Sequence, residues 1–269
     1  MNLTKSGVNA AISGVLLSLL LSACGGDNTA SLLASAKDYL AKNDNKAAVI
    51  QIKNALQQNP NSGEARLMLG SALLDAGDVS AAELEFRKAL ELKQSPELVL
   101  PQLAKAMLGQ GLVKKVIDEF SKTTMASAHA TAELQMSLTS AYAALGKADL
   151  SQAALNAALA AEPGFAPALL AQARQKAAGR DFDGALAMTD EIIAKNPKSF
   201  EAWKLKGDVL YFLKNQPVDA LAAYQKVVEI KPDILLGYNG ILTILLAQNN
   251  LPEAAKQLEQ LKKIAPPPS

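Results

Sequence analysis

The sequence predicts an all-α protein built from about seven helix–turn–helix repeats, and three observations lead to this prediction. First, 49% of the 269 residues are hydrophobic but only 4% are aromatic, which favours closely spaced helices rich in alanine and leucine over β-sheets. Second, a pattern of small and bulky apolar residues recurs every 34 or 35 residues. Third, glycine or asparagine lies near the middle of most repeats and proline near the end.

The charge balance and the scarcity of histidine and cysteine exclude several classes of function. The chain carries 27 basic and 26 acidic residues, a net charge of +1, so it lacks the basic character that nucleic-acid binding requires. Its single cysteine, Cys24, and its single histidine, His129, rule out a structural zinc site, a disulfide framework and a cysteine–histidine nucleophile pair. We therefore expect no metal, no cofactor and no nucleic-acid partner.

The first 23 residues have the features of a signal peptide. Lys5 supplies a positive charge, and an apolar stretch of 12 residues follows from Ala10 to Leu21. A helix of that length spans roughly 18 Å at about 1.5 Å per residue, well short of the ~30 Å hydrocarbon core of a bilayer. Residues 1–23 therefore suit a signal peptide better than a permanent membrane span.

The signal peptide ends in Leu21-Ser22-Ala23-Cys24, which resembles the lipobox of bacterial lipoproteins. In that family, small residues precede a cysteine that is acylated and becomes the mature N-terminus. The resemblance implies that residues 24–28 are an acylated Cys24 and a short linker, anchored in a membrane on its periplasmic side. Because Gly25 stands where inner-membrane lipoproteins often carry aspartate, the outer membrane is favoured. The alternative is an ordinary signal peptide followed by a chance cysteine.

The region 29–268 is predicted to be an array of repeats that begin near residues 29, 63, 97, 132, 166, 200 and 235. One column of mostly small residues consists of Ala48, Ala82, Val116, Ser151, Ala185, Ala220 and Ala254. Four residues later comes a bulkier column of Ile52, Phe86, Phe120, Leu155, Thr189, Tyr224 and Leu258. A spacing of four places both columns on one helical face. Another small column near the repeat starts is Ala36, Gly70, Ala104, Thr139, Ala173 and Gly207, with Leu242 as the exception in the last repeat.

The turns follow the same register. One column holds residues that tolerate the left-handed backbone of a tight turn, namely Asn43, Gly77, Gly111, Gly146 and Asn249. Gly179 lies one residue early, and in the sixth repeat Asn215 follows one inserted residue. The N-caps of second helices are expected at Ser80, Asp149 and Asp183.

This combination of columns, turns and prolines resembles the tetratricopeptide repeat family. The resemblance implies a right-handed superhelical solenoid in which the first helix of each repeat lines a concave, partner-binding face. Carried onto this sequence, the groove positions are Lys37, Asp75, Lys105, Met136, Arg174, Lys204, Asp208, Tyr211 and Asn239. The alternative for each of these residues is that it packs between repeats or lies on the surface without a binding role. Trp203 and Tyr238 occupy a position where the family carries a core aromatic residue.

No catalytic motif emerges from the sequence. The phosphate-binding loop, G-x-S-x-G and H-E-x-x-H are absent. We expect His129 to lie in a solvated loop between repeats, and Glu83 and Glu85 to be exposed, solubilising charges. The sequence therefore predicts a binding protein rather than an enzyme.

A narrower resemblance covers Leu32 to Phe120, which is similar to the tetratricopeptide lipoproteins encoded with exosortase (PEP-CTERM) protein-sorting and exopolysaccharide systems of Gram-negative bacteria. It implies a membrane-anchored periplasmic scaffold that binds envelope proteins in exopolysaccharide production or export, or in PEP-CTERM protein sorting. The alternative is a pilotin-like or general outer-membrane assembly lipoprotein that binds a secretin or another envelope complex. The predicted seventh repeat is very apolar, and the polar-faced helix that usually ends such arrays does not follow it, so we expect either that a partner covers this repeat or that the chain is a shortened form. Members of the resembled group are usually much longer, which agrees with a shortened form.

Overall fold

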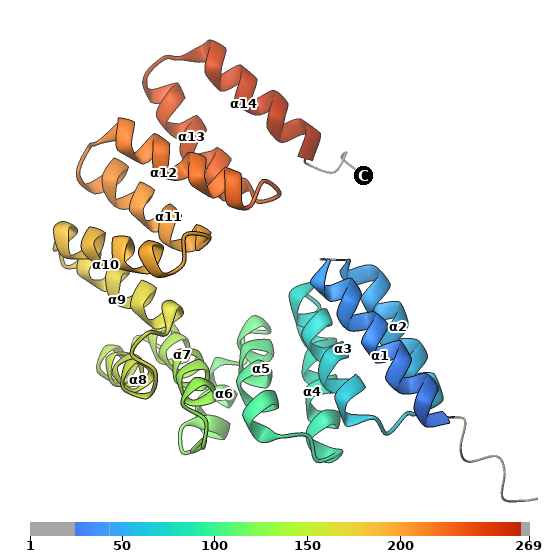
Figure 1. Cartoon of the computed structure of the whole chain (residues 1–269). Helices are drawn as coiled ribbons and strands as arrows, with labels where there is room; N and C mark the ends of the chain where they lie inside the picture. The colour runs from blue at the N-terminus through green and yellow to red at the C-terminus, as the bar shows by residue number, and fades with distance from the viewer. Residues whose placement is uncertain (1–24, 43, 265–269) are drawn as a thin grey trace, which may run out of the picture. The chain divides into compact units, whose positions relative to one another are not determined.

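The computed structural model describes residues 25–42 and 44–264, and all regular structure in these ranges is helical (Figure 1). The predicted all-α fold is thus confirmed. The predicted signal peptide, Cys24 and the last residues of the predicted array lie outside the described residues. No helix within the described ranges combines the length and the apolar character needed to cross a bilayer.

The helices follow one another as hairpins, and the chain divides into two compact units after Asp118. Figure 1 shows the two helices of a hairpin as neighbouring antiparallel ribbons. The first unit contains α1 (Gly25–Ala41), α2 (Asn45–Gln58), α3 (Gly63–Asp75), α4 (Val79–Glu91) and α5 (Pro96–Gly109). Helix α6 (Val113–Phe120) begins in this unit and ends after the boundary.

The second unit continues the same arrangement, with one irregular turn in its third hairpin. Its helices are α7 (Ala128–Ala144), α8 (Ala148–Ala161), α9 (Ala166–Ala178), α10 (Phe182–Lys195), α11 (Phe200–Asp208), α12 (Pro217–Ile230), α13 (Leu235–Ala247) and α14 (Leu251–Ile264). A π-helical turn, η1 (Val209–Leu213), extends α11.

The first helices of the hairpins can be compared with the predicted repeat starts. Helices α3, α9, α11 and α13 begin at residues 63, 166, 200 and 235, where the sequence columns put repeat starts. Helices α1 and α7 begin at residues 25 and 128, four residues before the predicted starts. Residues 25–28, expected as a linker, are therefore helical.

In the first unit, the core depends on a small residue opposite a large ring. Phe86 in α4 is fully buried, and a Cβ atom added to Gly70 in α3 would lie 2.7 Å from the Phe86 ring. Carbon atoms at optimal contact are about 3.5–4.0 Å apart. Glycine at position 70 is therefore what allows α3 and α4 to approach this closely.

The second unit repeats this arrangement around Tyr224 in α12. A Cβ atom on Gly207 in α11 would lie 2.8 Å from this ring, and one on Gly240 in α13 would lie 2.5 Å from it. The ring is 1% exposed and packs in a cluster with Leu210 and Ile241. Gly240, two residues before the exceptional Leu242 of the sequence column, thus allows the last hairpin to approach the sixth, because its contact with Tyr224 joins α13 to α12.

The turns between paired helices use the left-handed backbone that the sequence predicts, with one shift; the predicted turn residue Asn43 lies outside the described residues. Gly77, Gly111, Gly146 and Asn249 have φ values between +57° and +82°. In the fifth hairpin Arg180, with φ +66°, takes this conformation instead of Gly179. Gly179 remains at a negative φ as the C-cap of α9.

The expected helix N-caps were wrong by two residues. Asp78 and Asp181 cap α4 and α10 by accepting hydrogen bonds from backbone N–H groups three residues ahead. Ser80, Asp149 and Asp183 are the second residues of their helices, and Lys147 precedes α8 without a side-chain cap. A capping side chain must precede the first helical residue to reach the free N–H groups. Asp78 and Asp181 stand at that position, whereas Ser80 and Asp183 are already inside their helices.

Replacing Gly240 by alanine would place a methyl group in the space that the Tyr224 ring occupies. Overpacking costs about 1–3 kcal/mol, and the gain in helix propensity returns about 1 kcal/mol. We expect Gly240→Ala to lower the free energy of unfolding in urea by up to about 2 kcal/mol.

The matched control is Gly164→Ala in the same unit, where an added Cβ would meet nothing within 4 Å. It should change the free energy of unfolding by less than about 0.5 kcal/mol. Equal losses in both variants would contradict the assignment of glycine to the Tyr224 contact.

Candidate functional site

Two neighbouring hollows lie on the first helices of three successive hairpins in the second unit. Helix α9 contacts both α7 and α11, so the three helices form one face. The larger hollow, of about 500 Å³, is lined by Met136, Thr139, Ser140, Ala143, Ala166, Pro167, Leu170, Ala171, Arg174, Asn196, Ser199 and Glu201. The smaller hollow, of about 380 Å³, is lined by Arg174, Ala177, Lys204, Leu205, Asp208, Val209, Phe212 and Leu213.

The structure brings four of the predicted groove residues together in these hollows. Arg174 lines both of them, Met136 lines the larger, and Lys204 and Asp208 line the smaller. We call this surface of α7, α9, α11 and η1 the first-helix face. The smaller hollow has mostly apolar walls and three charged residues, whereas the larger hollow combines apolar residues with uncharged polar residues and two charged ones. Apolar surface with interspersed polar groups is typical of peptide-binding surfaces.

Two other predicted residues of the second unit lie apart from the hollows. Tyr211 is half-buried, packs against the cluster around Tyr224, and meets Phe212 edge-on with ring centroids 4.8 Å apart. Asn239 is exposed on α13, and its backbone carbonyl accepts a hydrogen bond from the Thr243 hydroxyl at 2.8 Å.

The remaining predicted groove residues belong to the first unit. Lys37 in α1 forms an ion pair of 2.7 Å with Glu64 in α3. Asp75 is exposed at the end of α3, and Lys105 is half-buried on α5. These three residues therefore lie on three successive first helices, as the repeat register implies.

A hydrogen-bond chain connects the buried Tyr224 to the smaller hollow. The Tyr224 hydroxyl donates to Oδ1 of Asp208 at 2.8 Å, and Lys204 Nζ donates to Oδ2 of the same carboxylate at 2.6 Å. Burial, with the neighbouring Asp208 carboxylate, raises the pKa of Tyr224 far above its usual value. The phenol therefore stays protonated and keeps donating, which holds the Asp208 carboxylate and the Lys204 ammonium in place.

The sequence prediction missed Phe212 and Leu213, which line the smaller hollow. The backbone amide of Lys214, directly after η1, donates to the carbonyl of Val209, five residues earlier, at 3.0 Å. This turn takes up the residue that the sequence inserts in the sixth repeat. The insertion was the available signal, because a π turn redirects the side chains that follow it.

The acidic residues Glu83 and Glu85 are not the exposed, solubilising charges that the sequence suggested. Glu85 is buried and pairs with Arg66 at 2.8 Å and with Lys88 at 3.3 Å. Glu83 accepts hydrogen bonds from Arg87 at 2.8 Å and from Gln110 at 2.6 Å. Contacts between neighbouring helices, which the repeat pattern alone does not reveal, cover both carboxylates.

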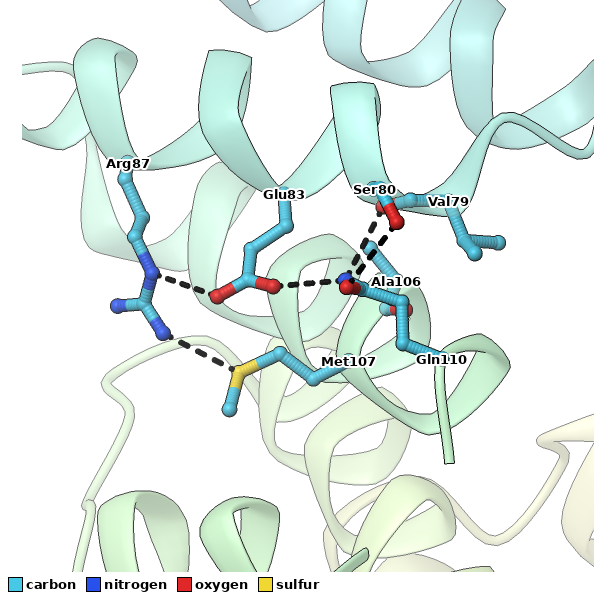
Figure 2. Close-up of polar contacts among 7 residues, drawn as sticks. All are labelled: Val79, Ser80, Glu83, Arg87, Ala106, Met107 and Gln110. Atoms are coloured by element: carbon cyan, nitrogen blue, oxygen red, sulfur yellow. Dashed lines mark hydrogen bonds and ion pairs between the residues drawn. The ribbon is translucent and has the colours of Figure 1, made fainter. Parts of the chain in front are cut away.

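Figure 2 shows how the Glu83 cluster joins α4 to α5 in the first unit. The Gln110 amide also donates to the Val79 carbonyl at 3.3 Å, and Arg87 contacts the sulfur of Met107 at 3.5 Å. Burial alone would raise the pKa of Glu83, but the hydrogen bonds from Arg87 and Gln110 and the nearby positive charges hold it below its usual value. This carboxylate stays charged and structural, and it does not have the raised pKa of a general acid.

Two further residues differ from their sequence interpretation. His129 lies in the first turn of α7 rather than in a loop, with Nδ1 2.8 Å from a carboxylate oxygen of Glu162. Trp203 is half-buried, and its indole N–H donates to the Pro197 carbonyl at 3.0 Å. Tyr238 is buried as predicted. Across the described ranges, no three histidine, cysteine or acidic residues gather to hold a metal ion.

The repeats have counterparts among known proteins. Residues 33–97 and 170–233 match the family described as Tetratricopeptide repeat. Among curated proteins, nothing matches the chain.

Several solved structures have the same fold. A tetratricopeptide repeat protein from Parabacteroides merdae ATCC 43184 has a TM-score of 0.60 at 18% identity, over 90% of this chain and 95% of that one. A chain of the APC/C hetero-tetramer Cut9–Hcn1 has a TM-score of 0.60 at 14% identity, with 81% of this chain spanning 43% of that one. The pilF protein of Pseudomonas aeruginosa has a TM-score of 0.55 at 15% identity, over 80% of this chain and 97% of that one.

Tyr224→Phe keeps the ring and removes the hydrogen bond to Asp208. We expect a loss of about 1 kcal/mol in the free energy of unfolding near pH 7. Because the folded protein raises the pKa of Tyr224, the unfolded phenol ionises first, and the wild type loses stability as the pH rises above about 10.

The variant lacks this titrating group, so its stability deficit should shrink by about 1.4 kcal/mol per pH unit above about pH 10. Urea denaturation of both proteins near pH 7 and near pH 11 measures the difference. A deficit that stays constant with pH would contradict the role of Tyr224 as a protonated donor.

Proposed function

Because the chain is a tetratricopeptide repeat protein, we propose that it is a non-enzymatic scaffold whose first-helix face binds a segment of another protein. The observation that carries this proposal is the pair of adjacent hollows, of about 500 Å³ and about 380 Å³, that share Arg174. Apolar walls interspersed with polar and charged groups can bury the side chains of an extended peptide or of an amphipathic helix.

The stiffness of the first-helix face supports the same proposal. The Asp208 carboxylate is held from both sides, by Tyr224 and by Lys204. Leu170, Leu205 and Val209 of the hollows are nearly fully buried, so they are fixed by the packing beneath them. A surface that is already ordered loses little conformational freedom when a partner binds, which favours affinity.

We also propose that a lipid on Cys24 anchors the chain to the outer membrane, facing the periplasm. The support is the resemblance of Leu21-Ser22-Ala23-Cys24 to a lipobox. Two or more acyl chains, each contributing ~0.8 kcal/mol per buried CH₂, give the durable anchoring that one chain does not. Helix α1 begins at Gly25, directly after the cysteine, so in this proposal the first hairpin lies next to the membrane surface.

The proposed pathway is exopolysaccharide production or export, or PEP-CTERM protein sorting, and the proposed partners are envelope proteins. The support is the similarity of residues 32–120 to tetratricopeptide lipoproteins of those systems. Exosortase and glycosyltransferase genes beside this gene, together with reduced exopolysaccharide in a deletion strain, would test the assignment. Normal polymer secretion and sorting in the deletion strain would contradict it.

The lipid anchor predicts the behaviour of Cys24→Ala. Loss of the acylated thiol should move the protein from the membrane fraction to the soluble fraction of cells. The matched control, Ser22→Ala, keeps a small residue before the cysteine and should stay in the membrane fraction. Membrane association that survives in Cys24→Ala would count against acylation.

The first-helix face predicts the effect of a bulky charge in the larger hollow. Ser140→Arg adds a long cation at an exposed position that lines this hollow. We expect partner retention in affinity capture to fall by about tenfold or more, as when a central contact of an interface is lost.

Ala153→Arg is the control, because Ala153 is exposed on α8, a second helix. It should retain the partner as the wild type does. If Ser140→Arg and Ala153→Arg retain equal amounts of partner, the first-helix face is not the binding surface.

A further inference from the structure

The smaller hollow combines an exposed apolar wall with a cation that lacks a counter-ion. Phe212 is 64% exposed and Leu213 is 42% exposed, although both are large apolar side chains. Arg174 is exposed at the edge of the same hollow, and within the described residues its guanidinium makes no ion pair. Exposed apolar patches rimmed by polar groups mark interaction sites.

The apolar wall exists because of the π-helical turn η1. A π turn takes up one extra residue and changes the direction of the following side chains by about 100°. In this turn Tyr211 packs on the cluster around Tyr224, while Phe212 and Leu213 line the hollow. The sixth hairpin therefore presents an aromatic side chain on the first-helix face.

The smaller hollow carries a net positive charge, because Arg174 and Lys204 are positive and only Asp208 is negative. Both oxygens of Asp208 are occupied, one by the Tyr224 hydroxyl and one by the Lys204 ammonium. Arg174 remains as the group that an incoming anion can pair with. A guanidinium binds a carboxylate through two parallel N–H···O hydrogen bonds, so a carboxylate fits this site better than a neutral group.

We propose that this hollow binds a segment of a partner protein in which an acidic side chain neighbours a large apolar one. The carboxylate pairs with Arg174, and the apolar side chain packs between Phe212, Leu213 and Val209. This inference rests on the proposed scaffold function and names the chemistry of the segment that it binds. An acidic polysaccharide would satisfy Arg174 but would leave the apolar wall exposed, so a peptide is the better match.

The test starts from a phage-displayed library of random dodecapeptides selected on the mature chain. We expect enrichment of peptides in which aspartate or glutamate neighbours a leucine, isoleucine, methionine, phenylalanine or tryptophan. The most enriched peptide is then synthesised in two forms, with the acid and with its amide counterpart. Fluorescence anisotropy gives Kd for each form against the wild type and the variants.

Arg174→Gln should weaken the acidic peptide by about tenfold and should abolish the preference for acid over amide, because it removes the paired charge. Arg174→Lys should restore part of that preference. Phe212→Ser should weaken both peptide forms by about fivefold to tenfold, because it removes apolar contact area. These residues are exposed, so the variants should keep the helical circular dichroism of the wild type.

Matched controls change the same residue types outside the hollow. Arg180→Gln alters an exposed arginine in the turn after α9, and Val218→Ser alters an apolar residue that is 76% exposed on α12. Both controls should keep Kd within about twofold of the wild type.

The outcomes separate this inference from the proposed function. Selected peptides that bind Arg174→Gln and Phe212→Ser normally but fail on Ser140→Arg would overturn the subsite and leave the scaffold function standing. Peptides that bind all three variants as tightly as the wild type would overturn both the subsite and the scaffold function. A library that yields no enriched peptide would do the same. Enrichment of basic peptides would overturn the proposed carboxylate, and Arg174-dependent binding of alginate oligosaccharides in place of peptides would overturn the proposed partner class.

Discussion

The close approach of neighbouring helices, with a small residue opposite a bulky ring, is the contact on which this structure depends. Gly70 opposite Phe86 and Gly240 opposite Tyr224 leave no room for even a methyl group. In repeat proteins each hairpin contacts mainly its neighbours, so stability is close to a sum of such local contacts. Because hairpins of this kind stack on one another, the first helices of successive hairpins in the second unit lie side by side and form the first-helix face.

The same packing reaches the candidate site through Tyr224. Its ring is held between Gly207 and Gly240, while its hydroxyl donates to Asp208 at the hollow between α9 and α11. A core residue therefore sets the position of a surface charge. This link explains how a face made of ordinary helical hairpins can have a defined polar pattern without a metal or a catalytic constellation.

Local sequence periodicity was sufficient to predict the fold, because the recurring small and bulky residues, such as Gly70 and Phe86, contact each other within a single hairpin. Met136 and Lys204 share the fifth position of their repeats, and Arg174 and Asp208 share the ninth. These two positions are four residues apart and therefore lie on one helical face, so all four residues could be placed together. Phe212 escaped prediction because the π turn shifts the register of the sixth repeat. The burial of Glu83 was not predicted because its partner Gln110, at the end of α5, is known only once α4 and α5 are packed; its other partner, Arg87, lies four residues later on α4 itself.

Methyl NMR of residues 24–269, labelled at the methionine methyl groups, can test whether a partner binds the first-helix face. Met136 lines the larger hollow of the first-helix face, whereas Met188 in α10 packs against the core cluster and Met107 is fully buried in the first unit. On addition of a captured partner or a selected peptide, the Met136 signal should shift or broaden while those of Met188 and Met107 stay unchanged. A bound complex in which Met136 is unperturbed and another methionine responds would contradict the assignment of binding to this face.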